Sequence, residues 1–202
     1  MTVYTIGYAT KSIATFTEQL RHYKVSAVCD VRSVPFSKRF FDYHQDAIKK
    51  HLNNAQIRYV YLGEELGPRS KNPDHYDECN QVQFETLMQS EHFLKGLDRL
   101  KNGLKQGFTI ALMCAEKDPG TCHRSLLIGY AVARLWKEEL MHITHEGGLE
   151  SQTDLERRLK QLHGLDDDLF ASEQDLLLQA YRKQLKATSY IKPTTTDPRQ
   201  LK

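Results

Sequence analysis

The stretch FTIALMCAEKDPGTCHRSLLIGYAVARL, residues 108–135, decides the fold of this chain. Residues 108–113 are apolar and rich in β-favouring types, so they predict a buried strand. A polar turn with a Pro-Gly pair follows, and an apolar helix begins after Arg124. A buried strand that leads through reactive side chains into a helix is typical of ligand sites in open α/β folds. We therefore expect a functional site in this turn.

Units of strand and helix recur on both sides of this stretch. Further strands are expected at residues 3–8, 26–32 and 57–62 and within 140–148. Helices are expected from Ser12 to Tyr23, at 46–54, at 84–104 with a break near Ser90, from a capping box at Thr153 and Glu156 to near His163, and from Ser172 onward. This alternation predicts an α/β fold: a Rossmann-like, mainly parallel sheet of about five strands with helices on both faces, plus C-terminal helices.

Length and patterning favour a single domain. We expect residues 1–188 to form one α/β domain with a helical extension from about residue 150. Residues 189–202 combine threonine, proline and charge without apolar periodicity, which predicts a disordered tail. The polar, turn-rich segment 63–81 is expected to be a structureless loop that covers a cleft.

Composition narrows the function classes. The net charge of +2 predicts no strongly basic nucleic-acid surface, although local patches are compatible with it. No segment approaches ~18 uninterrupted apolar residues, so no membrane partner is expected. The four cysteines are sparse for this length, and reduced thiols are the expectation. We expect a cytoplasmic protein.

Two familiar motifs and a metal signature are missing. Gly7 is followed by YATKS, not by the further glycines of a dinucleotide fingerprint, which argues against ordinary NAD or FAD binding. The residue six positions after Cys114 is Gly120, whereas a cysteine phosphatase loop needs arginine there. Cys114 and Cys122 lie eight residues apart, a spacing without a metal or redox signature. We therefore assign no metal and no cofactor from the sequence.

The predicted strand at 26–32 has two oppositely charged residues at its C-terminal end. Asp30 and Arg32 lie two residues apart, so both side chains should fall on the same side of the strand end. One interpretation is a self-contained ion pair. The other, which we favour, is a carboxylate and a guanidinium aimed into a cleft, because strand ends in parallel sheets are where sites collect.

The loop at residues 33–44 is aromatic and basic. Phe36, Phe40, Phe41 and Tyr43 alternate with Lys38, Arg39 and His44. Such a mixture can stack on a base and hold a phosphate, whereas the competing interpretation is a hydrophobic flap with its charges in water.

The turn after residue 113 carries the reactive groups. Cys114 is a candidate nucleophile, because a nearby arginine, a histidine and a helix N-terminus would lower its pKa. His123 and Arg124 fall where the helix dipole is positive, so an anion should offset them. The carboxylates of Glu116 and Asp118 can offset this positive charge within the protein. The other interpretation, which we favour, is that an anionic ligand offsets it.

Four motifs carry a family resemblance. TIGYATKSIATF, VCDVRSVPFSKR, YLGEELGPR and LMCAEKDPGTCHRSLLIG, in that order, resemble the domain-of-unknown-function 488 family over about Thr5 to Gly147. The resemblance implies a Rossmann-like fold in a cytoplasmic bacterial or archaeal protein, and no settled reaction. The family's characteristic positions correspond here to Tyr8, Asp30, Arg32, Cys114, Glu116, Cys122, His123 and Arg124.

Together these patterns predict an enzyme acting on a nucleotide, a nucleic-acid end or another phosphorylated ligand, with hydrolysis or cleavage of a glycosidic bond to a base as the reaction. The expected catalytic residues are Asp30, Glu116 and Cys114, and the expected ligand-binding residues are Tyr8, Arg32, Arg39, Arg69, Cys122, His123 and Arg124. The alternative is a non-catalytic sensor or adaptor that binds a nucleotide or nucleic acid in the same cleft. A thiol switch between Cys114 and Cys122 is a third possibility.

Overall fold

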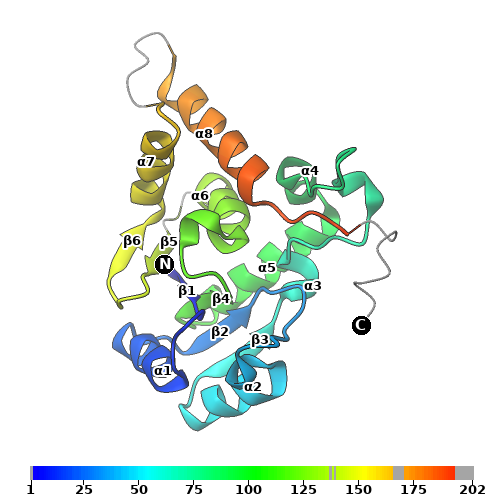
Figure 1. The fold of residues 1–202 in the computed structure, drawn as a ribbon. Helices are drawn as coiled ribbons and strands as arrows, with labels where there is room; N and C mark the ends of the chain where they lie inside the picture. The colour runs from blue at the N-terminus through cyan, green and yellow to red at the C-terminus, as the bar shows by residue number, and fades with distance from the viewer. Residues whose placement is uncertain (1, 137, 139, 166–170, 194–202) are drawn as a thin grey trace.

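The fold is built on one six-stranded sheet (Figure 1). The computed structural model describes residues 2–136, 138, 140–165 and 171–193. The strands are β1 (Val3–Gly7), β2 (Ala27–Asp30), β3 (Arg58–Tyr61), β4 (Ile110–Cys114), β5 (Leu140–Ile143) and β6 (Leu149–Ser151). Their order is β3-β2-β4-β1-β5-β6, with parallel pairing except between β5 and β6.

The expected α/β fold with a mainly parallel sheet is therefore confirmed. The five expected strands are present, and the sequence analysis missed β6, a three-residue antiparallel edge strand. The narrower Rossmann-like expectation is not confirmed, because β4 lies between β1 and β2 whereas the standard Rossmann order places these two side by side.

Helices cover both faces of the sheet. They are α1 (Ile13–His22), α2 (Gln45–Asn54), α3 (Gly63–Leu66), α4 (Phe84–Met88), α5 (Glu91–Lys105), α6 (Tyr130–Leu135), α7 (Gln152–Leu162) and α8 (Glu173–Thr188). Short 3-10 turns occupy Phe41–Tyr43, Pro73–His75 and Pro119–Thr121, and a π-helical segment spans Arg124–Gly129. Within the described residues, no helix combines the length and the apolar character needed to cross a lipid bilayer.

Alternation along β4 divides the core into two layers. Ala111 and Met113 join a cluster with apolar residues of α1 and α2, whereas Leu112 and Cys114 join a cluster with α5 and the segment after Arg124. This is the period of two that a buried strand imposes. Cys114 therefore lies at the end of the central strand, on the face that α5 and the C-terminal helices cover.

Side-chain caps set the starts of four α-helices, α1, α5, α7 and α8. Ser12, Ser90 and Ser172 each accept a hydrogen bond from the backbone N-H three residues later, and the helix starts expected at Ser12 and Ser172 are confirmed. The break between α4 and α5 lies at Ser90. The capping box placed at Thr153 is wrong: Ser151 caps α7, because the chain leaves β6 directly into that helix.

Two regions are more ordered than expected. Segment 63–81 contains α3, a 3-10 turn and a bridge between Tyr76 and Val82, so it is not structureless. The tail does not begin at residue 189: Tyr190 accepts a hydrogen bond from the backbone of Val82, and Ile191 bridges to Gln81. The rest of the predicted tail, 194–202, lies outside the described residues.

Candidate functional site

The strand ends converge because β4 is central. Cys114 is the register partner of Gly7 in β1, and Met113 is the partner of Asp30 in β2. The parallel pairing brings the turns that follow β1, β2 and β4 to one edge of the sheet. Residues from three distant parts of the sequence therefore meet at the end of β4.

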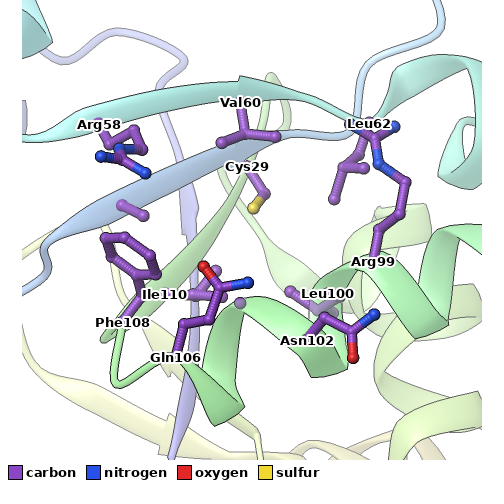
Figure 2. A pocket seen from close by; sticks show the side chains of 12 residues that line it. Cys29, Arg58, Val60, Leu62, Arg99, Leu100, Asn102, Gln106, Phe108 and Ile110 are labelled. Carbon is purple, nitrogen blue, oxygen red and sulfur yellow. The ribbon is translucent and has the colours of Figure 1, made fainter.

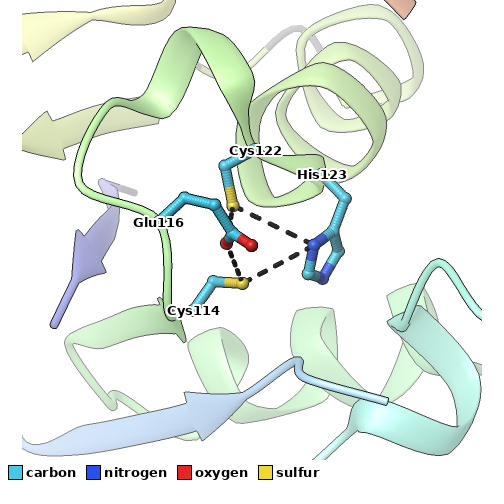
Figure 3. A group of neighbouring side chains, drawn as sticks. All are labelled: Cys114, Glu116, Cys122 and His123. Atoms are coloured by element: carbon cyan, nitrogen blue, oxygen red, sulfur yellow. Dashed lines mark hydrogen bonds between the residues drawn. The ribbon is translucent and has the colours of Figure 1, made fainter. Parts of the chain in front are cut away.

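Four side chains gather there, and we call them the Cys-Glu-Cys-His cluster: Cys114, Glu116, Cys122 and His123 (Figure 3). The Glu116 Oε2 atom accepts hydrogen bonds from the Cys114 Sγ at 2.8 Å and the Cys122 Sγ at 3.0 Å. The His123 Nδ1 lies 3.6 Å and 3.9 Å from the same two sulfurs. One sulfur, oxygen or nitrogen atom from each residue thus lies within 4.8 Å of the others.

The His123 ring is fixed by a bond on its far side. Its Nε2 lies 2.8 Å from the carbonyl oxygen of Val31, just after β2. A carbonyl oxygen only accepts, so Nε2 carries a proton and donates it. In the neutral ring, Nδ1 is then unprotonated, and its lone pair points toward the cysteine sulfurs.

The two thiols are not equivalent. Burial raises the pKa of the Cys114 thiol well above its usual value, and the neighbouring Cys122 raises it further. Burial acts in the same direction on Cys122, but the hydrogen bond from Cys114 and the positive charge of Arg124 outweigh it and lower the Cys122 pKa. A single negative charge on this pair therefore favours Cys122, whereas the sequence analysis named Cys114 as the nucleophile.

The pKa values of the Glu116 carboxyl and of the His123 imidazole are both raised. Burial of the carboxylate raises the pKa of Glu116, with a further contribution from Cys122. Although the Glu116 side chain is exposed overall, its carboxylate points at buried sulfurs (Figure 3). Burial lowers the pKa of the His123 imidazole, but the hydrogen bond and charge of Cys122 outweigh it and raise that pKa. Both shifts favour a proton bound within the cluster.

Arg124 lies beneath the cluster and is fully buried. Its guanidinium donates to the carbonyl oxygens of Glu116 at 2.7 Å and Lys117 at 3.3 Å, and its Nε donates to the Thr5 hydroxyl at 3.3 Å. Among the described residues, no carboxylate forms an ion pair with it. Arg124 thus holds the turn through neutral oxygens, and direct contact with the predicted anion would need the turn to move.

Asp30 and Arg32 form the ion pair that was the less favoured interpretation. Arg32 Nε and Nη2 donate to the two Asp30 carboxylate oxygens at 2.8 Å and 2.6 Å. The Tyr59 hydroxyl also donates to Asp30, and Arg32 donates to the Tyr8 hydroxyl. Asp30, Arg32 and Tyr8 are all buried, and none of the three lines either of the two cavities described below. Tyr8 instead stacks on Tyr43, with ring centroids 4.2 Å apart.

A cavity of about 220 Å³ opens beside the cluster. Its lining includes Glu116 and His123 from the cluster, Arg69 from the segment after β3, and Tyr190 from the chain after α8. Arg69 is exposed, and its guanidinium lies over the Tyr190 ring, 4.6 Å from the centroid. Within the part of the chain that the structure describes, this guanidinium has no ion pair or hydrogen bond.

Arg69 also lines a second, larger cavity of about 500 Å³. Its polar lining includes Ser33 from the loop after β2, together with Lys71 and His75 from the segment after β3. The exposed arginine therefore stands at the border of both cavities, with the cluster on one side of it.

A comparison with known proteins identifies the family. Residues 12–131 match the family described as "Domain of unknown function DUF488". The chain belongs to the DUF488 family. The matched region contains the whole cluster together with Arg69, whereas Tyr190 lies outside it. No curated protein and no solved structure matches the chain.

The C-terminal helices of this DUF488 protein brace the turn that carries the cluster. Arg158 of α7 forms an ion pair with Asp118 at 2.8 Å, and Gln184 of α8 donates to the carbonyl oxygen of Gly120 at 2.6 Å. Sequence reasoning missed these contacts and the role of Tyr190 in the cavity. Neither helical periodicity nor composition indicates which distant loop a polar helix residue will reach.

The side chains of the aromatic and basic loop at residues 33–44 lie partly in the core and partly on the surface. Tyr43 is buried and Phe40 packs edge-on against Tyr8, with centroids 5.9 Å apart. Phe36 and Phe41 remain exposed, and exposed Arg39 lies over the Phe40 ring. Arg39 does not line the cavity beside the cluster.

A third cavity, of about 270 Å³, lies between α5 and the β2–β3 edge (Figure 2). Cys29 is the thiol in its lining, and burial raises the pKa of that thiol to about 12. A thiol with such a pKa is protonated at neutral pH and is a poor nucleophile. None of the predicted site residues lines this cavity, so we place the functional site at the cluster.

Proposed function

We propose that this DUF488 protein is an enzyme that acts on a nucleotide, a nucleic-acid end or another phosphorylated ligand at the carboxyl edge of the sheet. One observation carries the proposal: Arg69 is exposed, has no anionic partner among the residues that the structure describes, and lines the same cavity as Glu116 and His123 of the cluster. Arginine suits phosphate because its planar donors match two phosphate oxygens.

Glu116 is the residue best suited to acid–base chemistry. Its carboxyl faces both the cavity and the thiols, and its raised pKa keeps a fraction protonated closer to neutral pH than an ordinary carboxyl. Such a group can protonate a leaving group in hydrolysis or in the cleavage of a glycosidic bond to a base. The buried Asp30 supports the fold around the site in this proposal, through its pair with Arg32.

A nucleotide panel tests the proposal. Affinities are measured by calorimetry for the wild-type chain, for Arg69→Ala and for Arg157→Ala, an exposed arginine on α7 that serves as the control. We expect at least one phosphorylated compound to bind, with affinity lowered ~10-fold or more by Arg69→Ala and unchanged by Arg157→Ala. Turnover of the bound compound, followed by chromatography, should stop in Glu116→Gln. If Arg69→Ala binds the compound with the wild-type affinity, Arg69 does not bind the phosphate.

The alternative function is a non-catalytic sensor that binds nucleic acid. It is supported by the exposed side chains of Val34, Phe36 and Phe41 next to Lys38 and Arg39. Exposed aromatic groups with nearby cations can stack on unpaired bases. Binding of a labelled single-stranded oligonucleotide, measured by fluorescence anisotropy, should then be weakened by Phe36→Ala and unaffected by Glu116→Gln. For the enzyme we expect the reverse, with Glu116→Gln as the damaging substitution.

The proposed partner is thus a phosphorylated small molecule or nucleotide, with nucleic acid as the alternative. We also propose a cytoplasmic location, which is supported by the four free cysteines, three of them buried as thiols.

A further inference from the structure

We infer that the Cys-Glu-Cys-His cluster is a binding site for one zinc ion, or for a similar divalent transition metal. The inference assigns a cofactor that the cysteine spacing did not indicate. It concerns the same place as the proposed function, but it rests on the donor atoms alone and does not depend on any phosphorylated ligand.

The donor atoms are already close to a coordination shell. In a tetrahedral zinc site, bond lengths of ~2.0–2.3 Å place neighbouring donor atoms about 3.3–3.8 Å apart. The His123 Nδ1 lies 3.6 Å and 3.9 Å from the sulfurs of Cys114 and Cys122. The Glu116 oxygen lies nearer to the sulfurs, at 2.8 Å and 3.0 Å, as expected while thiol protons occupy the centre. A shift of roughly 0.6–0.8 Å in the exposed Glu116 side chain would bring its oxygen to the tetrahedral separation from the two sulfurs.

His123 has the outer bond that a metal-bound histidine needs. Its Nε2 donates to the carbonyl oxygen of Val31 at 2.8 Å, which leaves the Nδ1 lone pair directed at the cluster. Histidines that bind metals commonly donate their other N-H to a carbonyl or carboxylate in this way, and the bond fixes both tautomer and ring orientation. The ring is therefore oriented for coordination by a contact with Val31, the residue that follows β2.

The types of donor select the metal. Two sulfurs and one imidazole nitrogen favour zinc and other borderline or soft ions, whereas magnesium and calcium prefer oxygen donors. Binding replaces the two thiol protons, which pass to solvent, and forms two metal–sulfur bonds. Two thiolates, one carboxylate and a divalent ion carry a net charge of −1. The buried guanidinium of Arg124, bonded to the Glu116 carbonyl oxygen, supplies the compensating positive charge.

Three of the metal donors are held in place by burial, and the fourth can exchange for another ligand. Cys114, Cys122 and His123 are buried, whereas Glu116 is exposed and lines the cavity beside the cluster. Catalytic zinc sites keep three protein donors and one exchangeable position, whereas structural sites are closed by four strong donors. The arrangement therefore fits a metal that can also contact a ligand in the cavity.

Metal binding is tested with the metal alone. The reduced, metal-free chain is titrated with Zn²⁺ against a chromogenic chelator, and Co²⁺ is used as a spectroscopic probe. We expect one ion per chain, sulfur-to-cobalt charge-transfer bands, and strong visible bands of tetrahedral Co²⁺. Cys114→Ser and Cys122→Ser should each lower the affinity ~100-fold or more, whereas Cys79→Ser, which changes an exposed cysteine that is not one of the four donors, should have no effect.

A measurement on the unmodified chain covers the case in which the buried variants fail to fold. Zn²⁺ should protect Cys114 and Cys122 from alkylation during partial denaturation and leave Cys79 reactive, as mapped by peptide mass spectrometry. Less than stoichiometric binding, or equal alkylation with and without Zn²⁺, would overturn the inference. Loss of both thiols to an intramolecular disulfide under mild oxidation, without metal affinity, would overturn it in favour of a thiol switch. Nucleotide binding is measured separately, so either proposal can fail alone.

Discussion

The guanidinium of Arg124 donates a hydrogen bond of 2.7 Å to the backbone carbonyl oxygen of Glu116, the residue whose carboxylate lies between two cysteine sulfurs. This charged side chain is fully buried, and it donates its hydrogen bonds to backbone and hydroxyl oxygens. This relationship makes the shape of the turn, and with it the cluster, depend on a residue that does not touch the cavity.

Replacing that arginine should loosen the turn. Arg124→Met removes the hydrogen bonds that the guanidinium donates to the Thr5 hydroxyl and to the carbonyl oxygens of Glu116 and Lys117. We expect the free energy of unfolding to fall by about 2–4 kcal/mol, measured by urea denaturation. The control, Arg157→Ala on the exposed face of α7, should leave the urea midpoint unchanged. An equal midpoint in both variants would mean that Arg124 does not hold the turn.

Gly7 should tolerate no side chain. A Cβ atom at this position would lie 1.9 Å from the Glu116 carbonyl oxygen, inside any real contact distance. Gly7→Ala should therefore destabilise the protein by about 1–3 kcal/mol and displace the turn. Gly148→Ala is the matched control, because its Cβ would meet the Thr144 hydroxyl at an ordinary 3.6 Å. Thermal unfolding of the two variants compares them, and a normal melting temperature for Gly7→Ala would contradict the expectation.

The buried histidine of β5 should make stability fall in acid. His142 is held between Thr5 and Gln152, and burial lowers its pKa to about 3. In the unfolded chain an ordinary histidine titrates near 6.5, so below that pH the unfolded state binds a proton that the folded state does not. Stability from this group is complete above about pH 6.5 and is lost as the pH falls toward 3, by at most ~1.4 kcal/mol per pH unit.

Denaturant titrations at a series of pH values measure this slope. His142→Gln should flatten it between about pH 6.5 and 4, because the titrating group is gone. His92→Gln, which changes an exposed histidine of α5, should keep the wild-type slope. If the slope of His142→Gln equals that of the wild type, the acid sensitivity arises elsewhere.

The chain after α8 should matter to ligand binding. Tyr190 lines the cavity beside the cluster, and its ring lies under the Arg69 guanidinium. Tyr190→Ala removes this cation–π contact and widens the cavity, so we expect a several-fold loss of affinity for the phosphorylated ligand found in the nucleotide panel. Its neighbour Ile191 is exposed, and Ile191→Ala should bind as the wild type does. Unchanged calorimetric affinity in Tyr190→Ala would exclude this part of the chain from the site.

Local patterns were sufficient for much of the framework. The apolar run before Cys114 predicted the central strand, and Ser12 and Ser172 predicted two helix starts, because strands and caps depend on neighbours within a few residues. The same patterns located the turn after β4 as the place where reactive groups gather. They failed at β6, where three residues pair only because β5 lies beside them.

What the sequence determined by itself, then, is the succession of strands and helices, the family, and the edge of the sheet at which the reactive residues lie. Only the tertiary structure decided what each charged residue does there. Arg32, Arg69 and Arg124 have the same type of side chain, yet Arg32 and Arg124 are buried and hydrogen-bonded inside the protein, whereas Arg69 is exposed at a cavity. The reason is physical: hydrogen-bond partners of a long side chain come from segments distant in sequence, and burial is a property of the packed whole.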